Sequence, residues 1–158
     1  IVKTLFGTVT GKRLAIYGFT FKADTNDTRE APSINIAKDL LEEGAQLAIY
    51  DPKVRTKQIE ADLNQQASSH PNINSKPSEA TIKGEGIWWP TNSALDAAKG
   101  VDAVIILTEW EEFKEICWEQ IAPTMRKPAW VFDSRGVVNI SHVKSAGLKI
   151  WRVGDGAI

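Results

Sequence analysis

A single α/β domain, with helices packed on both faces of a mostly parallel sheet, is the fold that this 158-residue sequence predicts. Short apolar runs alternate with amphipathic segments along the chain, a pattern typical of strands joined by helical crossovers. The runs are apolar throughout, as expected where both faces of a sheet are covered. Because such crossovers are right-handed in nearly all proteins, the pattern favours a doubly wound, Rossmann-like three-layer αβα fold.

Each predicted strand is a short apolar run followed by a glycine or by polar residues. The runs comprise residues 14–17, 47–50, 103–107, 129–132 and 148–153, with Trp88-Trp89 as a possible further short strand. The residues that end the first four of them are Gly18, Asp51-Pro52, Thr108-Glu109 and Asp133-Ser134-Arg135.

The predicted helices follow amphipathic and capping signals. One begins near Pro32, a residue favoured at the first helical position, and ends at Gly44. A short helix is predicted over residues 93–99. A third begins at Glu111, since acidic residues favour a first helical turn, and the last helical segment contains His142.

Two regions of the chain, at its N-terminus and in its middle, stand apart from the predicted strands and helices. Residues 1–6 have apolar side chains at helical spacing, so we expect 1–10 to be the end of a helix that begins upstream and 11–158 to form the domain. The chain is therefore interpreted as a fragment of a longer protein. Between Asn64 and Asn92 polar residues and glycines dominate without a clear period, which predicts a long, partly irregular excursion.

Charge and composition exclude several classes of function. The 19 basic and 20 acidic residues are interspersed, so the sequence has no electrostatic footprint for nucleic acid or for an anionic membrane. No apolar run approaches the roughly 20 residues that span a bilayer. The single cysteine, Cys117, cannot form an intrachain disulfide and favours a reducing compartment, so we expect a cytoplasmic protein.

Candidate ligand-binding residues lie where the strands end, because open α/β sheets bind ligands beyond the carboxyl ends of their strands. Two of the loops there carry a cation, Lys22 after the first strand and Arg135 after the 129–132 strand. Two cations directed at one crevice indicate an anionic ligand such as a phosphate. The alternatives are that Lys22 is simply solvated and that Arg135 forms an ion pair with Asp133.

Other candidate constellations are weaker. Asp51 occupies the position of a ribose-binding acid, but Asp-Pro is also an ordinary turn signal. Neither G-x-G-x-x-G nor G-x-x-x-x-G-K-[ST] occurs, so no independent NAD or ATP site of the usual kind is expected. Cys117 lies in an apolar helical stretch and is predicted to pack rather than to act as a nucleophile. His70 and His142 are far apart in the sequence and predict neither a metal site nor a triad.

The strongest functional signal is a long motif that follows the first strand. It reads G-F-x-F-K-x-D-T-x-D-T-R-E-x-P over residues 18–32, and further matching segments are Ile49-Tyr50-Asp51-Pro52-Lys53-Val54, Thr108-Glu109-Trp110 and Val131-Phe132-Asp133-Ser134-Arg135. On these residues the chain resembles the C-terminal UDP-binding domain of the UDP-glucose/GDP-mannose dehydrogenase family. Phe19 and Thr28 make it most similar to the UDP-glucose branch, because the other branches more often have Leu at both positions.

The resemblance implies an activity, a cofactor and partners. Family members oxidise the C6 hydroxyl of UDP-glucose to a carboxylate in two NAD-dependent steps, with a catalytic Cys that traps the intermediate as a thiohemiacetal and a thioester. An N-terminal Rossmann domain holds NAD, and a central helix, whose end would be residues 1–10 here, joins the two halves. We therefore expect UDP-glucose as ligand, NAD bound mainly outside this chain, the missing N-terminal and central domains as partners, and a homo-oligomer.

The same resemblance assigns individual residues. Phe21 and Lys22 would contact UDP-glucose, with Lys22 close to the reacting sugar, and Arg135 would contact it from the neighbouring loop. Arg29 would reach the NAD. No catalytic residue and no metal ligand is expected in this chain, because Cys117 matches no catalytic position of the family. We therefore expect the chain alone to be inactive.

Two residues depart from the family pattern, and three alternative functions stay open. Most members have Gly where Ser134 stands, so the loop that holds Arg135 could differ in shape, and Ala23 stands where animal relatives tend to have Lys. The alternatives are the same domain from a GDP-mannose or UDP-N-acetylmannosamine dehydrogenase, a non-catalytic nucleotide-sugar-binding or assembly module, and an interaction domain that uses Trp88 and Trp89.

Overall fold

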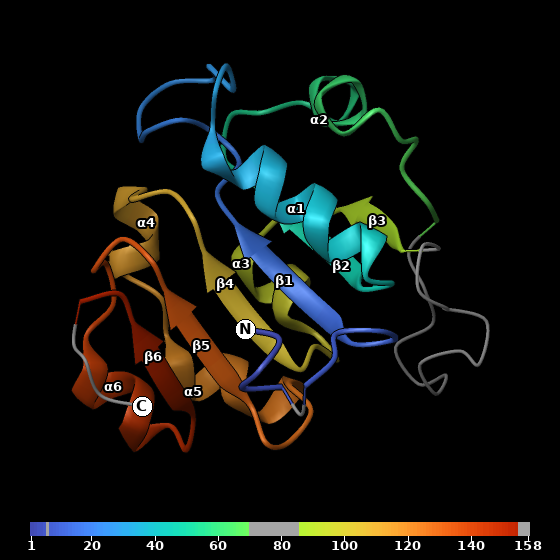
Figure 1. The fold of residues 1–158 in the computed structure, drawn as a ribbon. Coiled ribbons are helices and arrows are strands. Elements are labelled where there is room, and N and C mark those ends of the chain that lie inside the picture. Colours follow the sequence, from blue (N-terminus) through green and yellow to red (C-terminus); the bar gives the residue numbers. More distant parts are fainter. Residues whose placement is uncertain (6, 70–85, 155–158) are drawn as a thin grey trace.

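A six-stranded sheet forms the centre of the computed structural model, which describes residues 1–5, 7–69 and 86–154. All five strand pairings are parallel, and the strand order is β3-β2-β1-β4-β5-β6 (Figure 1). The chain winds outward from β1 to one edge, returns to the middle at β4, and winds to the other edge. The strands are β1 (Arg13–Tyr17), β2 (Gln46–Tyr50), β3 (Ile87–Pro90), β4 (Ala103–Ile106), β5 (Trp130–Asp133) and β6 (Lys149–Arg152). This order confirms the predicted doubly wound fold.

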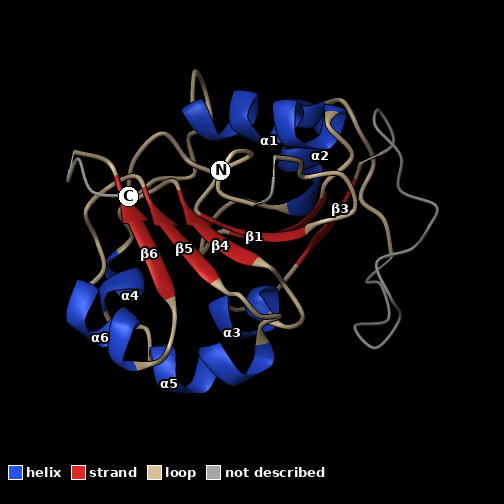
Figure 2. Cartoon of the chain, turned by 60° about the horizontal axis from the view of Figure 1, so that its bottom comes forward, coloured by secondary structure: helices blue, strands red, loops and turns tan. Residues whose placement is uncertain are grey.

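Helices cover both faces of the sheet, which gives three layers (Figure 2). One face is covered by α1 (Pro32–Glu42) and α2 (Thr56–Leu63). The opposite face is covered by α3 (Ala94–Ala98), α4 (Glu111–Lys114), α5 (Trp118–Ile121) and α6 (Ile140–Ser145). None of the helices in the described part of the chain is long and apolar enough to cross a membrane.

The hydrophobic core consists of two clusters, one on each side of the sheet. Alternate residues of a strand point to opposite faces, so Ala15 and Tyr17 join one cluster while Leu14 and Ile16 join the other. Every residue of β1 and β2 is buried, which explains why both strands are continuously apolar after their first residues, Arg13 and Gln46, instead of alternating.

The two tryptophans of β3 belong to this core. Trp88 is 0% and Trp89 is 3% exposed, and they lie on opposite faces of the sheet, one in each cluster. The alternative of an interaction surface built on these two side chains is therefore wrong, because both are covered within the chain itself. The possible short strand at Trp88-Trp89 is confirmed.

The structure differs from the sequence-based expectation at two helices. The helix α2 was not expected, and the reason is that only Ile59 and Leu63 of its eight residues are buried, which leaves little apolar periodicity. The helical segment that begins at Glu111 is divided into α4 and α5. Cys117 precedes α5 as its N-cap and is exposed, so the prediction that it packs in an apolar helical stretch is wrong.

The N-terminal segment and the excursion are each described in part. Residues 2–5 form turns, in which the backbone N–H of Leu5 donates to the carbonyl of Ile1 at 2.9 Å, and Leu5 is buried against the core. The assignment of 1–10 as the end of a linking helix stays a prediction. Of the predicted excursion, residues 64–69 contain no regular element and 70–85, with His70, lie outside the described residues.

Candidate functional site

The candidate site is formed by three loops at the carboxyl edge of the sheet. They follow β1, β4 and β5, and these strands are neighbours, with β4 in the middle. The predicted cations Lys22 and Arg135 come from the two outer loops, and the middle loop contains Thr108-Glu109-Trp110. The sheet order therefore brings together the two loops that the sequence singled out, as expected for the ligand-binding edge of such a fold.

Side-chain to backbone hydrogen bonds tie the three loops to one another. The Thr108 hydroxyl donates to the carbonyl of Thr20 at 2.9 Å, and the Ser134 hydroxyl donates to the carbonyl of Ile106 at 2.6 Å. Gly18, with a φ of +92°, lets the first loop pass so close to the second that a Cβ there would lie 2.4 Å from the Cβ of Thr108. The three loops are thus one connected unit.

Glu109 joins the Lys22 loop to the Arg135 loop. Its carboxylate forms an ion pair with the guanidinium of Arg135, and both side chains are about one third exposed. Burial raises the pKa of Glu109. Hydrogen bonds from its own backbone N–H, from Arg135 and from the backbone of Ala23, together with the charge of Arg135, lower it by more, so the pKa lies below its ordinary value. Glu109 is therefore ionised at neutral pH.

The alternative in which Arg135 pairs with Asp133 is wrong. Asp133 is fully buried, and its carboxylate forms an ion pair with Arg152 at 3.3 Å while accepting backbone N–H groups from Arg135 and Val138. It shapes the turn and leaves the Arg135 side chain to Glu109. Sequence reasoning missed this role of Glu109, although its position after the middle strand was the available signal.

Phe21 and Lys22 protrude from the first loop. The backbone there is held by the Thr20 hydroxyl, which donates to the Lys22 carbonyl at 2.8 Å, and by a Phe21 N–H bond to the Asp27 carbonyl at 3.0 Å. Phe21 is 51% exposed, and Lys22 is also exposed. No ion pair of Lys22 occurs within residues 1–5, 7–69 and 86–154.

Arg29 lies on the same side of the first loop as Phe21. Both line an open pocket of about 470 Å³ with Asp27 and Glu30. The Arg29 guanidinium pairs with the Asp27 carboxylate at 2.8 Å, and hydrogen bonds from the side chain and backbone of Arg29 lower the pKa of Asp27 to about 2. Arg29 stays 89% exposed in this pair, so its outer edge is open to a ligand.

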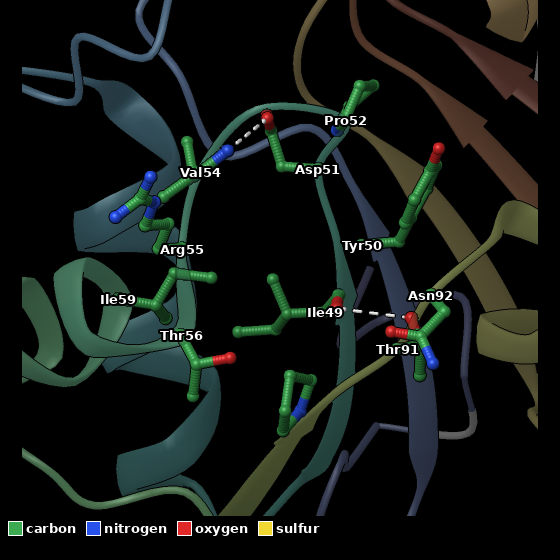
Figure 3. A pocket seen from close by; sticks show the side chains of 11 residues that line it. Ile49, Tyr50, Asp51, Pro52, Val54, Arg55, Thr56, Ile59, Thr91 and Asn92 are labelled. Atoms are coloured by element: carbon green, nitrogen blue, oxygen red, sulfur yellow. Dashed lines mark hydrogen bonds between the residues drawn. The ribbon is translucent and has the colours of Figure 1, made fainter.

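A second pocket, of about 500 Å³, lies beyond the ends of β2 and β3 (Figure 3). Its lining comprises Ile49, Tyr50, Asp51, Pro52, Val54, Arg55, Thr56, Ile59, Pro90, Thr91 and Asn92. This is where a dinucleotide fold holds its ribose-binding acid, so the state of Asp51 decides what the pocket can do.

The carboxylate of Asp51 is occupied by the chain itself. One oxygen accepts the backbone N–H groups of Lys53 (2.8 Å) and Val54 (3.1 Å), the second of which is drawn in Figure 3. The other oxygen accepts the backbone N–H of Phe19 (2.7 Å) and the indole N–H of Trp110 (3.2 Å). Two oxygens with two donors each have no lone pair left for a ribose hydroxyl. The turn-forming role of Asp51 is the one that the structure supports.

Metal chemistry has no visible basis in the described ranges. No group of three or more His, Cys, Asp or Glu side chains that could hold a metal ion occurs among those residues. His142 lies in α6 and belongs to no such group.

The fold and the site together define a class of protein, a doubly wound α/β domain whose carboxyl edge carries Lys22 and Arg135 and whose Asp51 is saturated by N–H groups of the chain. The chain belongs to the UDP-glucose/GDP-mannose dehydrogenase family and matches the UDP binding domain of that family over residues 15–140.

Known proteins support this membership. The chain is 40% identical over 156 residues to UDP-glucose 6-dehydrogenase 4 of Arabidopsis thaliana. This match covers 98% of this chain and 32% of that protein. It spans about a third of the length of the curated relatives that it matches. Among solved structures, a UDP-D-ManNAc dehydrogenase from Pyrococcus horikoshii superposes with a TM-score of 0.68 at 22% identity, over 99% of this chain and 29% of that one. A UDP-glucose dehydrogenase from Pyrobaculum islandicum gives a TM-score of 0.59 at 21% identity, over 86% and 24% of the two chains. These two structures confirm the fold.

Ser134, which stands where most members of the family have Gly, fits the backbone of its loop. Ser134 is not among the residues with positive φ, so the position does not require glycine in this chain. Its hydroxyl and its backbone N–H both donate to the Ile106 carbonyl, which fixes the start of the Arg135 loop on β4.

Proposed function

We propose that this chain is the nucleotide-sugar-binding domain of an NAD-dependent UDP-glucose 6-dehydrogenase. One observation carries the proposal: in a chain of this family, the loops bearing Lys22 and Arg135 are held together at the carboxyl edge through Glu109. The diphosphate of a nucleotide sugar needs cations of two kinds, a planar fork for paired oxygens and a mobile point charge, and Arg135 and Lys22 supply them. The identity to plant UDP-glucose 6-dehydrogenases favours UDP-glucose as the nucleotide sugar.

In this proposal the chain binds and orients while the chemistry takes place beside it. Phe21 and Lys22 contact UDP-glucose, and Lys22 assists near the C6 group as it is oxidised on the way to UDP-glucuronate. NAD, when bound, accepts the hydride from C6 and is held mainly by an N-terminal domain outside this chain. Arg29 fits the edge of that cofactor, since it is an exposed cation beside Phe21, and the saturated Asp51 fits a domain without its own ribose site.

The proposal extends to the setting of the protein. Holding a nucleotide sugar between this domain and a cofactor domain requires both domains in one assembly, and we propose that this assembly is a homo-oligomer in the cytoplasm. The chain alone then lacks dehydrogenase activity. Addition of NAD and UDP-glucose to it is expected to give no NADH absorbance, and NADH formation would contradict this part of the proposal.

Ligand titrations of the chain test the proposal. Calorimetry is expected to show weak binding of UDP-glucose, with a dissociation constant up to the millimolar range, and no binding of NAD. Lys22→Ala is expected to weaken UDP-glucose binding roughly tenfold, because one charge-assisted contact of about 1.5 kcal/mol is lost. Lys57→Ala, which removes an exposed lysine from α2, is the matched control and is expected to change nothing. Absence of binding at millimolar UDP-glucose would contradict the proposal, and so would equal binding by the Lys22→Ala chain.

The particular nucleotide sugar is tested by competition. UDP-glucose is expected to displace bound UDP more effectively than GDP-mannose or UDP-N-acetylmannosamine does. A stronger competition by either of these would move the assignment to another branch of the same family.

A further inference from the structure

An acidic residue stands in the middle of the cationic edge. Glu109 follows β4, between the loops of Lys22 and Arg135, and its carboxylate contacts the guanidinium of Arg135 and the backbone of Ala23. A carboxylate at this position repels an anionic ligand and reduces the net charge of the site. Its side chain is 36% exposed, so it faces the ligand's approach as well as its partners. Attraction of the ligand therefore does not explain why Glu109 stands at this position.

Hydrogen bonds from backbone N–H groups and from Arg135, together with the charge of Arg135, keep the Glu109 carboxylate ionised. Arg135 and Lys22 lie in the adjoining loops, and the nearest other acid of the Arg135 loop, Asp133, is fully buried and paired with Arg152. Glu109 is the carboxylate paired with Arg135, so a ligand bound to Arg135 would meet it at neutral pH.

Two kinds of diphosphate differ in how they meet such a carboxylate. In a nucleoside diphosphate sugar the outer phosphate is esterified by the sugar, so it carries one charge, and the sugar offers hydroxyl groups that donate hydrogen bonds to a carboxylate. In a free nucleoside diphosphate the outer phosphate is a monoester-like group whose second pKa is about 6, so near neutral pH it carries close to two charges and has no hydroxyl to donate. A carboxylate beside Arg135 repels the free nucleoside diphosphate more strongly than the nucleoside diphosphate sugar, and it can accept a hydrogen bond from the sugar of the latter.

We propose that Glu109 is a specificity-determining residue that makes the site favour a nucleoside diphosphate sugar over the corresponding free nucleoside diphosphate. The proposal rests on the proposed function, because it takes the Lys22 and Arg135 edge as the diphosphate site. Glu109 acts by charge and by hydrogen-bond acceptance, and it also keeps the Arg135 guanidinium extended toward the ligand.

The effect is expected to be moderate in size. Two unit charges a few ångströms apart near a protein surface interact strongly enough to change an equilibrium by one or two orders of magnitude, and water and salt at a part-exposed group reduce this. Removal of the Glu109 charge is therefore expected to tighten the binding of UDP roughly tenfold. Binding of UDP-glucose is expected to change by about twofold or less, since the loss of the sugar contact offsets the gain in net positive charge.

The test is a pair of titrations, with UDP and with UDP-glucose, on the chain and on three variants. Glu109→Gln keeps the shape of the side chain and removes its charge, and it is expected to lower the ratio of the UDP to the UDP-glucose dissociation constant about fivefold or more. Glu109→Asp keeps the charge and is expected to retain a ratio close to that of the parent chain. Glu112→Gln removes a nearby carboxylate that accepts the Tyr50 hydroxyl at 2.9 Å, and it is expected to leave the ratio unchanged.

The outcomes separate this inference from the proposed function. If the parent chain binds both ligands and Glu109→Gln alters both affinities by the same factor, Glu109 merely holds Arg135 and the specificity role is wrong. A loss of discrimination in Glu112→Gln as large as in Glu109→Gln would also contradict the role, because the effect would then be one of general charge. If the parent chain binds neither ligand, the proposed function fails and this inference fails with it.

Discussion

The two halves of the carboxyl edge use their charged residues in opposite ways. Beyond β2 and β3, Asp51 lies at the mouth of a pocket of about 500 Å³, yet both of its oxygens are occupied by N–H groups of the chain. Beyond β1, β4 and β5, Lys22 is exposed and Arg135 has a carboxylate partner that still leaves its side chain 37% exposed. A charged residue at a strand end therefore indicates a ligand site only when the fold leaves it unsatisfied.

This difference separates stability from binding along one edge of one sheet. In the half beyond β2 and β3, the Asp51 carboxylate joins the loop after β1 to the segment before α2, because it accepts the backbone N–H groups of Phe19 and Val54. The cationic half is held by backbone-directed bonds of Thr108 and Ser134, so its charged ends remain available. Changes in the first half should alter the free energy of unfolding, and changes in the second should alter affinity.

The largest expected effect is on the junction between the two halves, at Gly18. Gly18→Ala places a Cβ 2.4 Å from the Cβ of Thr108 and 2.9 Å from its backbone nitrogen, at a φ of +92°. Strain and overpacking together are expected to cost about 3–5 kcal/mol of unfolding free energy, measured by urea denaturation. Gly7→Ala is the control, because its φ is +77° but nothing lies within 4 Å, and it should cost about 1 kcal/mol. Equal losses of unfolding free energy in the two variants would show that the loop after β1 does not pack closely against Thr108.

A smaller loss of stability is expected at Asp51. Asp51→Asn replaces one acceptor oxygen by an NH₂ group that faces two N–H donors, and the charge is lost as well. The expected destabilisation is about 2–3 kcal/mol, with UDP-glucose affinity within about twofold of the parent chain. Asp39→Asn, at an exposed position of α1, should stay within about 0.5 kcal/mol. A large loss of ligand affinity in a folded Asp51→Asn chain would move the binding site to the β2 and β3 half.

The smallest expected effect concerns the exposed pair of Arg29 and Asp27. The folded-state pKa of Asp27 is about 2, below its ordinary value of 3.8, so the pair contributes above the ordinary pKa and its contribution disappears as the pH falls toward 2. Arg29→Ala should return the Asp27 pKa toward 3.8 in an NMR titration and lower the melting temperature at pH 7 only slightly, because both groups are solvated. An unchanged Asp27 pKa in the variant would show that Arg29 does not hold the carboxylate in solution.

Much of the fold could be predicted from the sequence because the parallel strands are continuous apolar runs. The runs at 14–17, 47–50 and 103–107 coincide with β1, β2 and β4 to within about one residue, and the turn signals after them mark the carboxyl edge of the sheet. The helix α2 could not be predicted in the same way, since two buried residues in eight make a weak amphipathic pattern. The break before Cys117 was also missed, because backbone breaks between short helices depend on how α4 and α5 pack on the sheet.

The candidate site shows the same limit. Lys22 and Arg135 could be placed at one edge from the order of strands and loops alone. The partner of Arg135 could not be predicted, because sequence proximity pointed to Asp133, whereas the sheet brings Glu109 close from the loop after β4, 26 positions earlier. The tertiary structure determines which charged side chains are hydrogen-bonded or paired by neighbouring loops. It therefore also determines which half of the edge keeps charges available for a ligand.

Chemical-shift mapping of the labelled chain with UDP-glucose tests this division most directly. We expect the largest amide shifts at residues 20–23, at Glu109 and at residues 134–136, with little change at 51–56 and 91–92. The reverse pattern, with the largest shifts around the Asp51 pocket and none near Lys22 and Arg135, would contradict it.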